Sequence, residues 1–365
     1  MVRLPSRRAR RLQWLLLAAV ILLAGWIVSN AADNLAVRRL GFSFDYLAAP
    51  AHFDIPFHLI DWATTDSYGR VLLVGLLNTA LVSVAGIVAS TVLGVVVGVM
   101  RLSSNWLWRQ LAAGFVELIR NTPQLIQIVF WYLAVLQALP SPRQSIAILP
   151  GVLLNVRGLF VPRPIWTDHA AASMTAACAF VPIAAWAVRR WGWAMLALLV
   201  PAAVLVGLSV ERVEWPQLGG FNIKGGVSLP PEFVALWFGL SVYSAAFIAE
   251  IVRGAIEAVP KGQTEAARAL GLRPGRALAS VVMPQALRMM VPPLTSQYLN
   301  LFKSSSLGAA IAFPEVFQIF AGTALNQSGR EIETMSLVIA VFLGISLSVS
   351  ALMNAYNARL SLDRR

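Results

Sequence analysis

A group of polar residues recurs inside the apolar stretch 291–313. Gln297, Asn300 and Ser304 follow one another at steps of three and four residues, so they share one helix face, and Lys303 lies beside them. A charged group at membrane depth is costly unless it faces a partner or a polar path. The Lys303 ammonium group suits a carboxylate. We therefore predict a substrate path formed by Gln297, Asn300, Lys303, Ser304, Ser305, Ser306 and Glu250.

Two charged positions allow a purely structural interpretation as well. Lys303 could pair with Glu250 or with carbonyl groups at a helix break, and the residue types leave both roles open. Glu117 and Arg120 are one helical turn apart, just before Asn121-Thr122-Pro123. For these two, a local ion pair ahead of a proline kink is favoured over a role in substrate binding.

A second candidate site lies in the stretch 258–288, which has a helix-turn-helix outline. Thr264 is placed to cap a short helix, Glu265 favours its positive end, and Gly271 is a natural C-terminal cap. Small residues on one face let such a helix lie in a groove of another protein. The predicted contact residues are Thr264, Glu265, Ala266, Ala267, Leu270 and Gly271.

Composition indicates what kind of elements position these residues. The chain has 365 residues, 58% of them hydrophobic and only 13% charged, against about 25% charged in soluble domains. Apolar runs of about 20 residues are long enough to cross a bilayer as helices. About eight spans are predicted, at 12–29, 71–100, 111–138, 170–188, 191–210, 233–253, 291–313 and 335–356.

The net charge of +12 follows the loops of alternate membrane sides. Basic residues gather in 1–11, in 258–288 and in 357–365, whereas acids gather in 30–69. The positive-inside rule then places both termini and the 258–288 loop in the cytoplasm, and 30–69 in the periplasm. A membrane-anchored DNA-binding regulator is disfavoured, because membrane spans leave no room for a third helix and its core.

The sequence carries no zinc-protease, nucleophile-elbow, dinucleotide or phosphate-loop motif, so we expect neither enzyme activity nor a cofactor in this chain. His52 and His58 are interpreted as part of a solvated loop, and no metal site is expected. An ion-coupled secondary transporter is the main alternative by composition. Such carriers place acids at mid-membrane, however, and here the acids keep to loops or span ends.

The spacing of Glu265-Ala266-Ala267, Gly271 and Val281-x-Met283-Pro284 resembles the EAA loop of ABC importer permeases. The segments 245–254, 120–123 and 284–288 are similar to the polar amino acid branch of that superfamily. The segment 66–70, the inserted hairpin and the ending 321–329 resemble the first permease subunit of general L-amino acid importers. One departure concerns the path: Phe302 and Ser304 stand where such relatives tend to have Thr and Asn.

The resemblance implies an all-α, polytopic membrane protein with a type I (MetI-like) core over 71–355. That core would contain an inserted hairpin at 140–231, with 258–288 as the coupling loop. It also implies a subunit of an ATP-driven importer of L-amino acids in the bacterial inner membrane. The expected partners are a sister permease in a heterodimer, two ATPase subunits that bind ATP and Mg²⁺, and a periplasmic amino-acid-binding protein.

Overall fold

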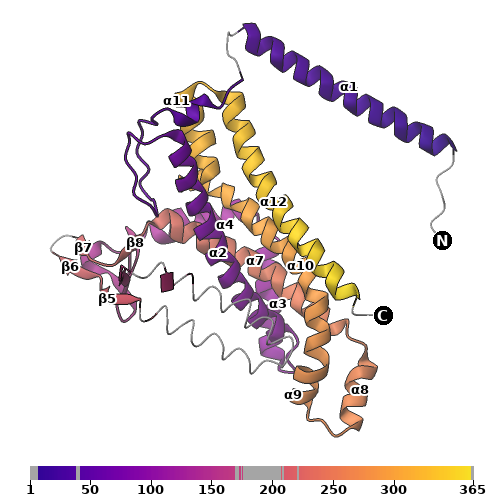
Figure 1. Cartoon of the computed structure of the whole chain (residues 1–365). Coiled ribbons are helices and arrows are strands. Elements are labelled where there is room, and N and C mark those ends of the chain that lie inside the picture. Colours follow the sequence, from indigo (N-terminus) through magenta and orange to yellow (C-terminus); the bar gives the residue numbers. More distant parts are fainter. Residues whose placement is uncertain are drawn as a thin grey trace.

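The computed structural model describes residues 7–37, 42–168, 209–219 and 222–362, with single positions at 172, 173, 175 and 207. A bundle of long helices carries a small layer of β-strands on one side (Figure 1). Helix α1, Arg7–Val37, stands clear of the bundle, and it contains the predicted first span, 12–29. The predicted spans 170–188 and 191–210 fall almost entirely outside the described residues.

Helices α2, Tyr68–Arg101, and α7, Pro231–Glu257, form the centre of the bundle and pack along each other. Two glycines of α2 allow this close approach. A Cβ atom at Gly94 would lie 2.6 Å from the Ile248 side chain, and one at Gly98 would lie 2.8 Å from the Ala249 carbonyl oxygen. The small residues therefore serve helix packing within the chain.

Within the described residues, three helices are long and apolar enough to cross a membrane: α2, α7 and α12, Glu331–Leu362. They contain the predicted spans 71–100, 233–253 and 335–356. The count of eight spans stays a prediction.

The predicted span 111–138 is not one continuous helix. Helix α3, Trp106–Arg120, ends before Pro123, and α4, Gln124–Phe130, begins after it and runs into a π-helical turn, η2, Trp131–Leu136. Pro123 has no N–H group to continue the first helix, and it disfavours helical geometry at the preceding residue. The expected proline kink is therefore present as a break between two helices, and the span 111–138 stays a prediction.

Helix α10, Met283–Ser304, begins earlier than the predicted span 291–313. Pro284 occupies its first turn, where a missing N–H group costs little, and Pro292 and Pro293 lie inside it. The chain then tightens into a 3₁₀ helix, η6, Ser305–Ile311, which ends at Ala312 with a positive φ of 58°. The predicted span is thus split between two helix types.

The expectation of an all-α chain is wrong for the segment 140–231, where short antiparallel strands flank the inserted hairpin. They form one four-stranded sheet, β1-β2-β3-β8, and two strand pairs, β4-β5 and β6-β7. The bounds are Ile146–Leu149, Val152–Asn155, Gly158–Val161, Arg163–Trp166, Val210–Glu214, Gln217–Gly219, Asn222–Lys224 and Val227–Leu229. These strands are too short to be evident from sequence alternation. They pair because turns join them, as at Gly151, whose φ of 75° favours glycine.

The segment 42–67, with the 3₁₀ turn η1, Asp45–Ala48, covers one end of α2. Asn78 on α2 is fully buried, and its amide nitrogen donates at 2.8 Å to the carbonyl oxygens of both Phe57 and Pro314. Buried polar groups need such partners. Asn78 therefore joins two segments that are far apart in the sequence.

The region after η6 returns to the bundle through buried polar contacts. Glu315 is fully buried, and its carboxylate accepts from the backbone N–H groups of Phe317 at 2.9 Å and Gln318 at 2.6 Å. These bonds satisfy the start of a π-helical turn, η7, Gln318–Ala324. A short helix, α11, Leu325–Ser328, and Gly329 then lead into α12.

We predict that Gly98→Val destabilises the folded protein by about 1–3 kcal/mol, because the added side chain overpacks the contact with α7. The measurement is the thermal unfolding temperature of the purified protein in detergent. Gly344→Val on α12 is the matched control, because a Cβ atom there meets nothing within 4 Å. Equal unfolding temperatures for the two variants would contradict this account of the helix contact.

Candidate functional site

A cavity of about 280 Å³ lies between α4, α7 and α10. Four of the predicted path residues border it: Gln297, Asn300, Lys303 and Ser304. We call it the Lys303 cavity. The structure thus places these four residues as neighbours around one hollow, and their role in a substrate path stays a prediction.

Glu250 does not belong to this cavity. Its carboxylate pairs with Arg101 at the end of α2 and with Arg253 one turn along α7, at 2.9 Å. The proposed Lys303–Glu250 pair is therefore wrong. In the described part of the chain, the Lys303 ammonium group has no carboxylate within ion-pair distance, so it remains available to a ligand.

Ser305 and Ser306 also point elsewhere. The Ser305 hydroxyl is buried and donates to the Phe302 carbonyl oxygen at 2.7 Å. The Ser306 hydroxyl donates to the Lys303 carbonyl oxygen at 2.9 Å, and Ser306 borders a neighbouring groove beside α12 that Lys303 also reaches. The change from α-helix to 3₁₀ helix after Ser304 rotates these two residues away from the cavity.

Five further cavity residues were not singled out from the sequence: Gln124, Tyr243, Ser244, Phe247 and Leu301. Gln124 is the first residue of α4, directly after the proline break. The rings of Tyr243 and Phe247 lie 5.0 Å apart on one face of α7. Their spacing of one helical turn was visible, but in a strongly apolar helix it is equally typical of core packing.

The predicted coupling stretch forms helix α8, Lys261–Ala269, followed by a short helix, α9, Pro274–Ala277. Thr264 is not its cap: Pro260 precedes the first turn, and Thr264 lies inside the helix. Gly271 does end it, as expected. The N–H group of Gly271 donates to the Arg268 carbonyl at 2.9 Å and that of Leu272 to the Ala267 carbonyl at 3.1 Å, while Gly271 has a φ of 75°.

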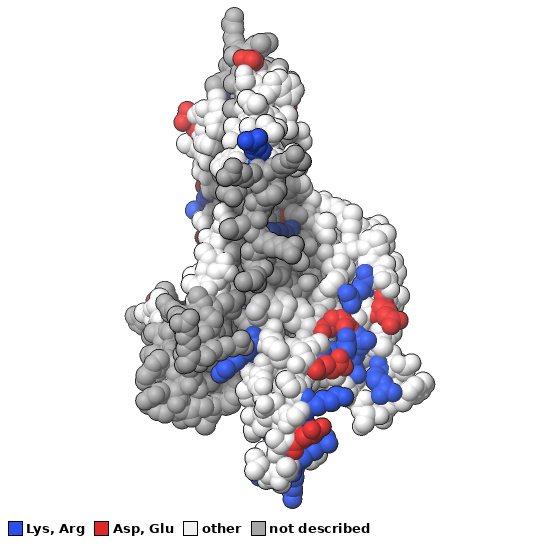
Figure 2. Space-filling view, turned by 90° about the vertical axis from the view of Figure 1, so that its right-hand side faces the viewer, with Lys and Arg blue, Asp and Glu red and all other residues white. Residues whose placement is uncertain are grey.

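Exposure divides the predicted contact face of α8. Ala267 is buried against the rest of the chain, whereas Glu265 and Ala266 are exposed and Leu270 is 82% exposed. Such a strongly exposed apolar side chain at the tip of a loop suits contact with another protein. Figure 2 shows basic and acidic side chains interspersed over the lower part of the molecule, which carries α8 and α9.

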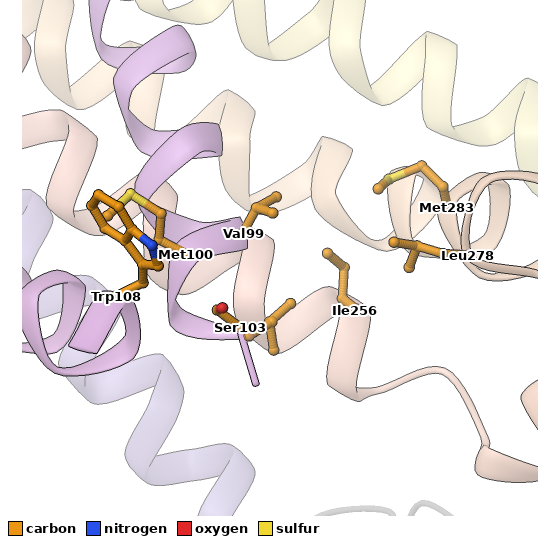
Figure 3. Close-up of a pocket in the computed structure, with 8 residues that line it drawn as sticks. Val99, Met100, Ser103, Trp108, Ile256, Leu278 and Met283 are labelled. Carbon is orange, nitrogen blue, oxygen red and sulfur yellow. The ribbon is translucent and has the colours of Figure 1, made fainter. Parts of the chain in front are cut away.

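An apolar cavity of about 570 Å³ separates the coupling loop from the corner between α2 and α3. Met100 and Trp108 line it on one side, and Leu278 and Met283 on the other, with Ile256 of α7 between them (Figure 3). Leu278 is the first residue of the π-helical turn η5, Leu278–Val282, and Met283 directly follows it. The loop therefore contacts α7 directly but meets the α2–α3 corner across a hollow.

Comparison with known proteins identifies this architecture. The family of binding-protein-dependent transport system inner membrane components matches residues 90–362. The chain belongs to this family. It is therefore a permease component of a transport system rather than an enzyme.

The relatives that match this permease over their full length are named as amino acid transport proteins. The chain is 45% identical to a putative amino-acid ABC transporter permease protein, YhdX, of Escherichia coli, covering 99% of this chain and 96% of the relative. It is 43% identical to the general L-amino acid transport system permease protein AapQ of Rhizobium johnstonii, covering 99% and 94%. A glutamate/glutamine/aspartate/asparagine transport permease, BztB of Rhodobacter capsulatus, is 36% identical over 98% of this chain and 95% of its own.

The fold of the permease is also that of solved relatives. The structure of an amino acid ABC transporter with histidines matches with a TM-score of 0.52 and 20% identity, covering 80% of this chain and 95% of the other. The type I, MetI-like permease fold expected from the EAA loop is therefore confirmed.

We predict that Gly271→Ala loosens the end of α8 by about 1–2 kcal/mol, because a side chain disfavours the left-handed conformation there. Amide hydrogen exchange in α8 should accelerate by roughly 5–30-fold. Gly262→Ala in the same helix is the matched control, and it should protect the helix slightly because alanine favours helical geometry. Unchanged exchange in Gly271→Ala would contradict the capping role.

Proposed function

We propose that this permease forms the membrane path of an ATP-driven importer of L-amino acids. The observation that carries the proposal is the Lys303 cavity, in which an ammonium group that pairs with no carboxylate of the described residues shares the lining with amide and hydroxyl side chains. The names of the full-length relatives, which describe amino acid transport, support the same substrate class.

The groups around this cavity suit the common part of every amino acid. Lys303 would bind the α-carboxylate through a charge-assisted hydrogen bond. The amide oxygens of Gln297 and Asn300 can accept from the α-ammonium group, and the Ser304 hydroxyl can donate or accept. Ser304 leaves the site less polar than the Asn typical of similar permeases, which favours broad selection by the shared backbone groups, whereas Phe302 packs against Phe342 outside the cavity.

Helix α8 is proposed to couple this path to ATP hydrolysis in separate subunits, which would bind ATP and Mg²⁺. Its exposed Glu265, Ala266 and Leu270 would lie in a groove of an ATPase subunit. Movement of α8 would pass through η5 to α7, because Val282 and Ala286 pack against Val252 and Ala255 of α7. Helix α7 then carries the movement to the Lys303 cavity, which it borders.

The same proposal assigns the remaining partners and the orientation. A sister permease would complete the path as a heterodimer, and a periplasmic binding protein would deliver the amino acid. The distribution of basic residues supports cytoplasmic termini and a cytoplasmic α8.

We predict that Lys303→Met weakens amino acid binding by about tenfold or more, because a hydrogen bond to a charged group contributes about 1.5–3 kcal/mol. The measurement is ATP-driven uptake of labelled amino acids into vesicles that contain the whole complex. Lys303→Arg should retain part of the uptake, since it keeps the positive charge.

Ser306→Ala is the matched control for this prediction, because its hydroxyl bonds to the backbone and it does not border the Lys303 cavity. Full uptake by Lys303→Met would contradict a substrate role for the ammonium group.

We predict that Glu265→Arg leaves the protein inserted and ATP hydrolysis active but lowers uptake by about tenfold, as expected for the loss of about 1.4 kcal/mol of coupling. Uptake and phosphate release are measured on the same vesicles. Glu331→Arg, an equally exposed charge reversal at the start of α12, is the control. Tight coupling in Glu265→Arg would argue against α8 as the ATPase contact.

A further inference from the structure

A second cavity, of about 430 Å³, lies on the side of the Lys303 cavity that is nearer the end of α2. Its polar lining consists of Arg101, Glu117, Arg120, Asn121 and Glu250, with Phe247 as its aromatic wall. We call it the Arg120 cavity. It is built from α2, α7, α3 and the cap of α3, so it is distinct from the site around Lys303.

The two cavities share one side chain. Phe247 borders both of them and therefore stands between them. On one side its ring faces Tyr243, with the ring centres 5.0 Å apart. On the other side the Arg120 guanidinium carbon lies 5.0 Å from the ring centre, a cation–π contact that holds the ring in place.

The charges in the Arg120 cavity divide into a paired and an unpaired set. Arg101 pairs with Glu250, which is shared with Arg253, and Arg253 in turn pairs with Glu257, so these charges balance one another. The expected ion pair between Glu117 and Arg120 is not formed: across the described residues, neither side chain makes an ion pair or a hydrogen bond, and Arg120 instead covers Phe247. One free carboxylate and one free guanidinium thus face the same hollow.

We propose that the Arg120 cavity is a second amino acid site, which receives the substrate from the Lys303 cavity past the Phe247 ring. Arg120 would bind the α-carboxylate through paired N–H donors, and Glu117 would bind the α-ammonium group. The proposal rests on the proposed function, since it requires that amino acids use this path.

The charges of Glu117 and Arg120 favour a zwitterionic amino acid as the ligand. A single carboxylate and a single guanidinium on neighbouring turns of α3 match a zwitterion, whereas an anion alone or a cation alone would leave one of them unpaired. To bind the carboxylate of the substrate, the Arg120 guanidinium must give up its contact with the Phe247 ring. Binding of substrate in the second site therefore releases the ring that separates the two sites, which links transfer to the position of Phe247.

The test measures equilibrium binding of radiolabelled L-alanine, L-glutamate and L-lysine, each separately, to the purified whole complex without ATP. Glu117→Gln and Arg120→Gln should each lose one equivalent of bound label per subunit. Lys303→Met should lose a different equivalent, and combining it with Glu117→Gln should lose both, because separated sites act additively. Arg109→Gln, an exposed arginine on the same helix, is the matched control and should bind as the unaltered protein does.

Each result has a clear meaning. Glu117 is exposed and makes no ion pair or hydrogen bond with the described residues, so its amide variant tests the site even if Arg120→Gln folds poorly. If the unaltered complex imports amino acids but Glu117→Gln binds as much label as the control, the second site is overturned while the proposed function stands. If the unaltered complex neither binds nor imports any of the three amino acids, the proposed function fails as well.

Passage between the sites is tested by Phe247→Ala, which should increase leakage of preloaded amino acid from vesicles in the absence of ATP. Phe238→Ala, on the same helix but packed against Trp131 with ring centres 4.6 Å apart, is the control and should not leak. Tight vesicles with Phe247→Ala would overturn the role of the ring as the partition.

Discussion

The close contact between α2 and α7 is the constraint on which the rest of the bundle depends. Gly94 and Gly98 leave room for the backbone of α7 at Ala245 and Ala249, and no larger residue fits without movement. One turn beyond Gly98, Arg101 meets Glu250, so the same approach that packs the helices also aligns an ion pair at their end. With α7 held in this way, the opposite face of that helix, with Tyr243 and Phe247, is left to border the two cavities.

The proline break after α3 places polar groups on both sides of Phe247. Arg120 and Asn121, before the break, border one cavity, whereas Gln124, after it, borders the other. In a continuous helix each residue is rotated from the previous one by a fixed angle, so these side chains could not border both cavities in this arrangement. The cost of an interrupted backbone is reduced by Gln127, whose amide nitrogen donates to the carbonyl oxygens of Ile119 at 2.9 Å and Thr122 at 3.1 Å.

In the 258–288 loop, helix α8 has a hydrogen-bonded C-terminal end and an exposed apolar side chain at its tip. The paired backbone bonds around Gly271 close α8, and Ala267 anchors it to the chain, while Leu270 projects outward. The segment that follows α8 packs against side chains of α7, whereas an apolar hollow beside Met100 and Trp108 separates it from the α2–α3 corner. The loop is therefore packed on one helix of the bundle and separated from its neighbour by a hollow.

The sequence by itself determined the membrane class, the long central helices, the glycine-terminated helix α8 and the polar face of α10, because hydrophobic runs, glycine caps and helical periodicity are local properties. It placed Gln297, Asn300, Lys303 and Ser304 on one helix face, and the structure brings all four to the border of one cavity. It could not decide the partner of Glu250, the rotation of Ser305 and Ser306, or the stacking of Arg120 on Phe247. Those depend on contacts between elements that lie far apart in the chain, or on a change of helix type that no sequence motif predicts. The strands beside the inserted hairpin were missed for the same reason: each is only three to five residues long, and only pairing across the sheet stabilises it.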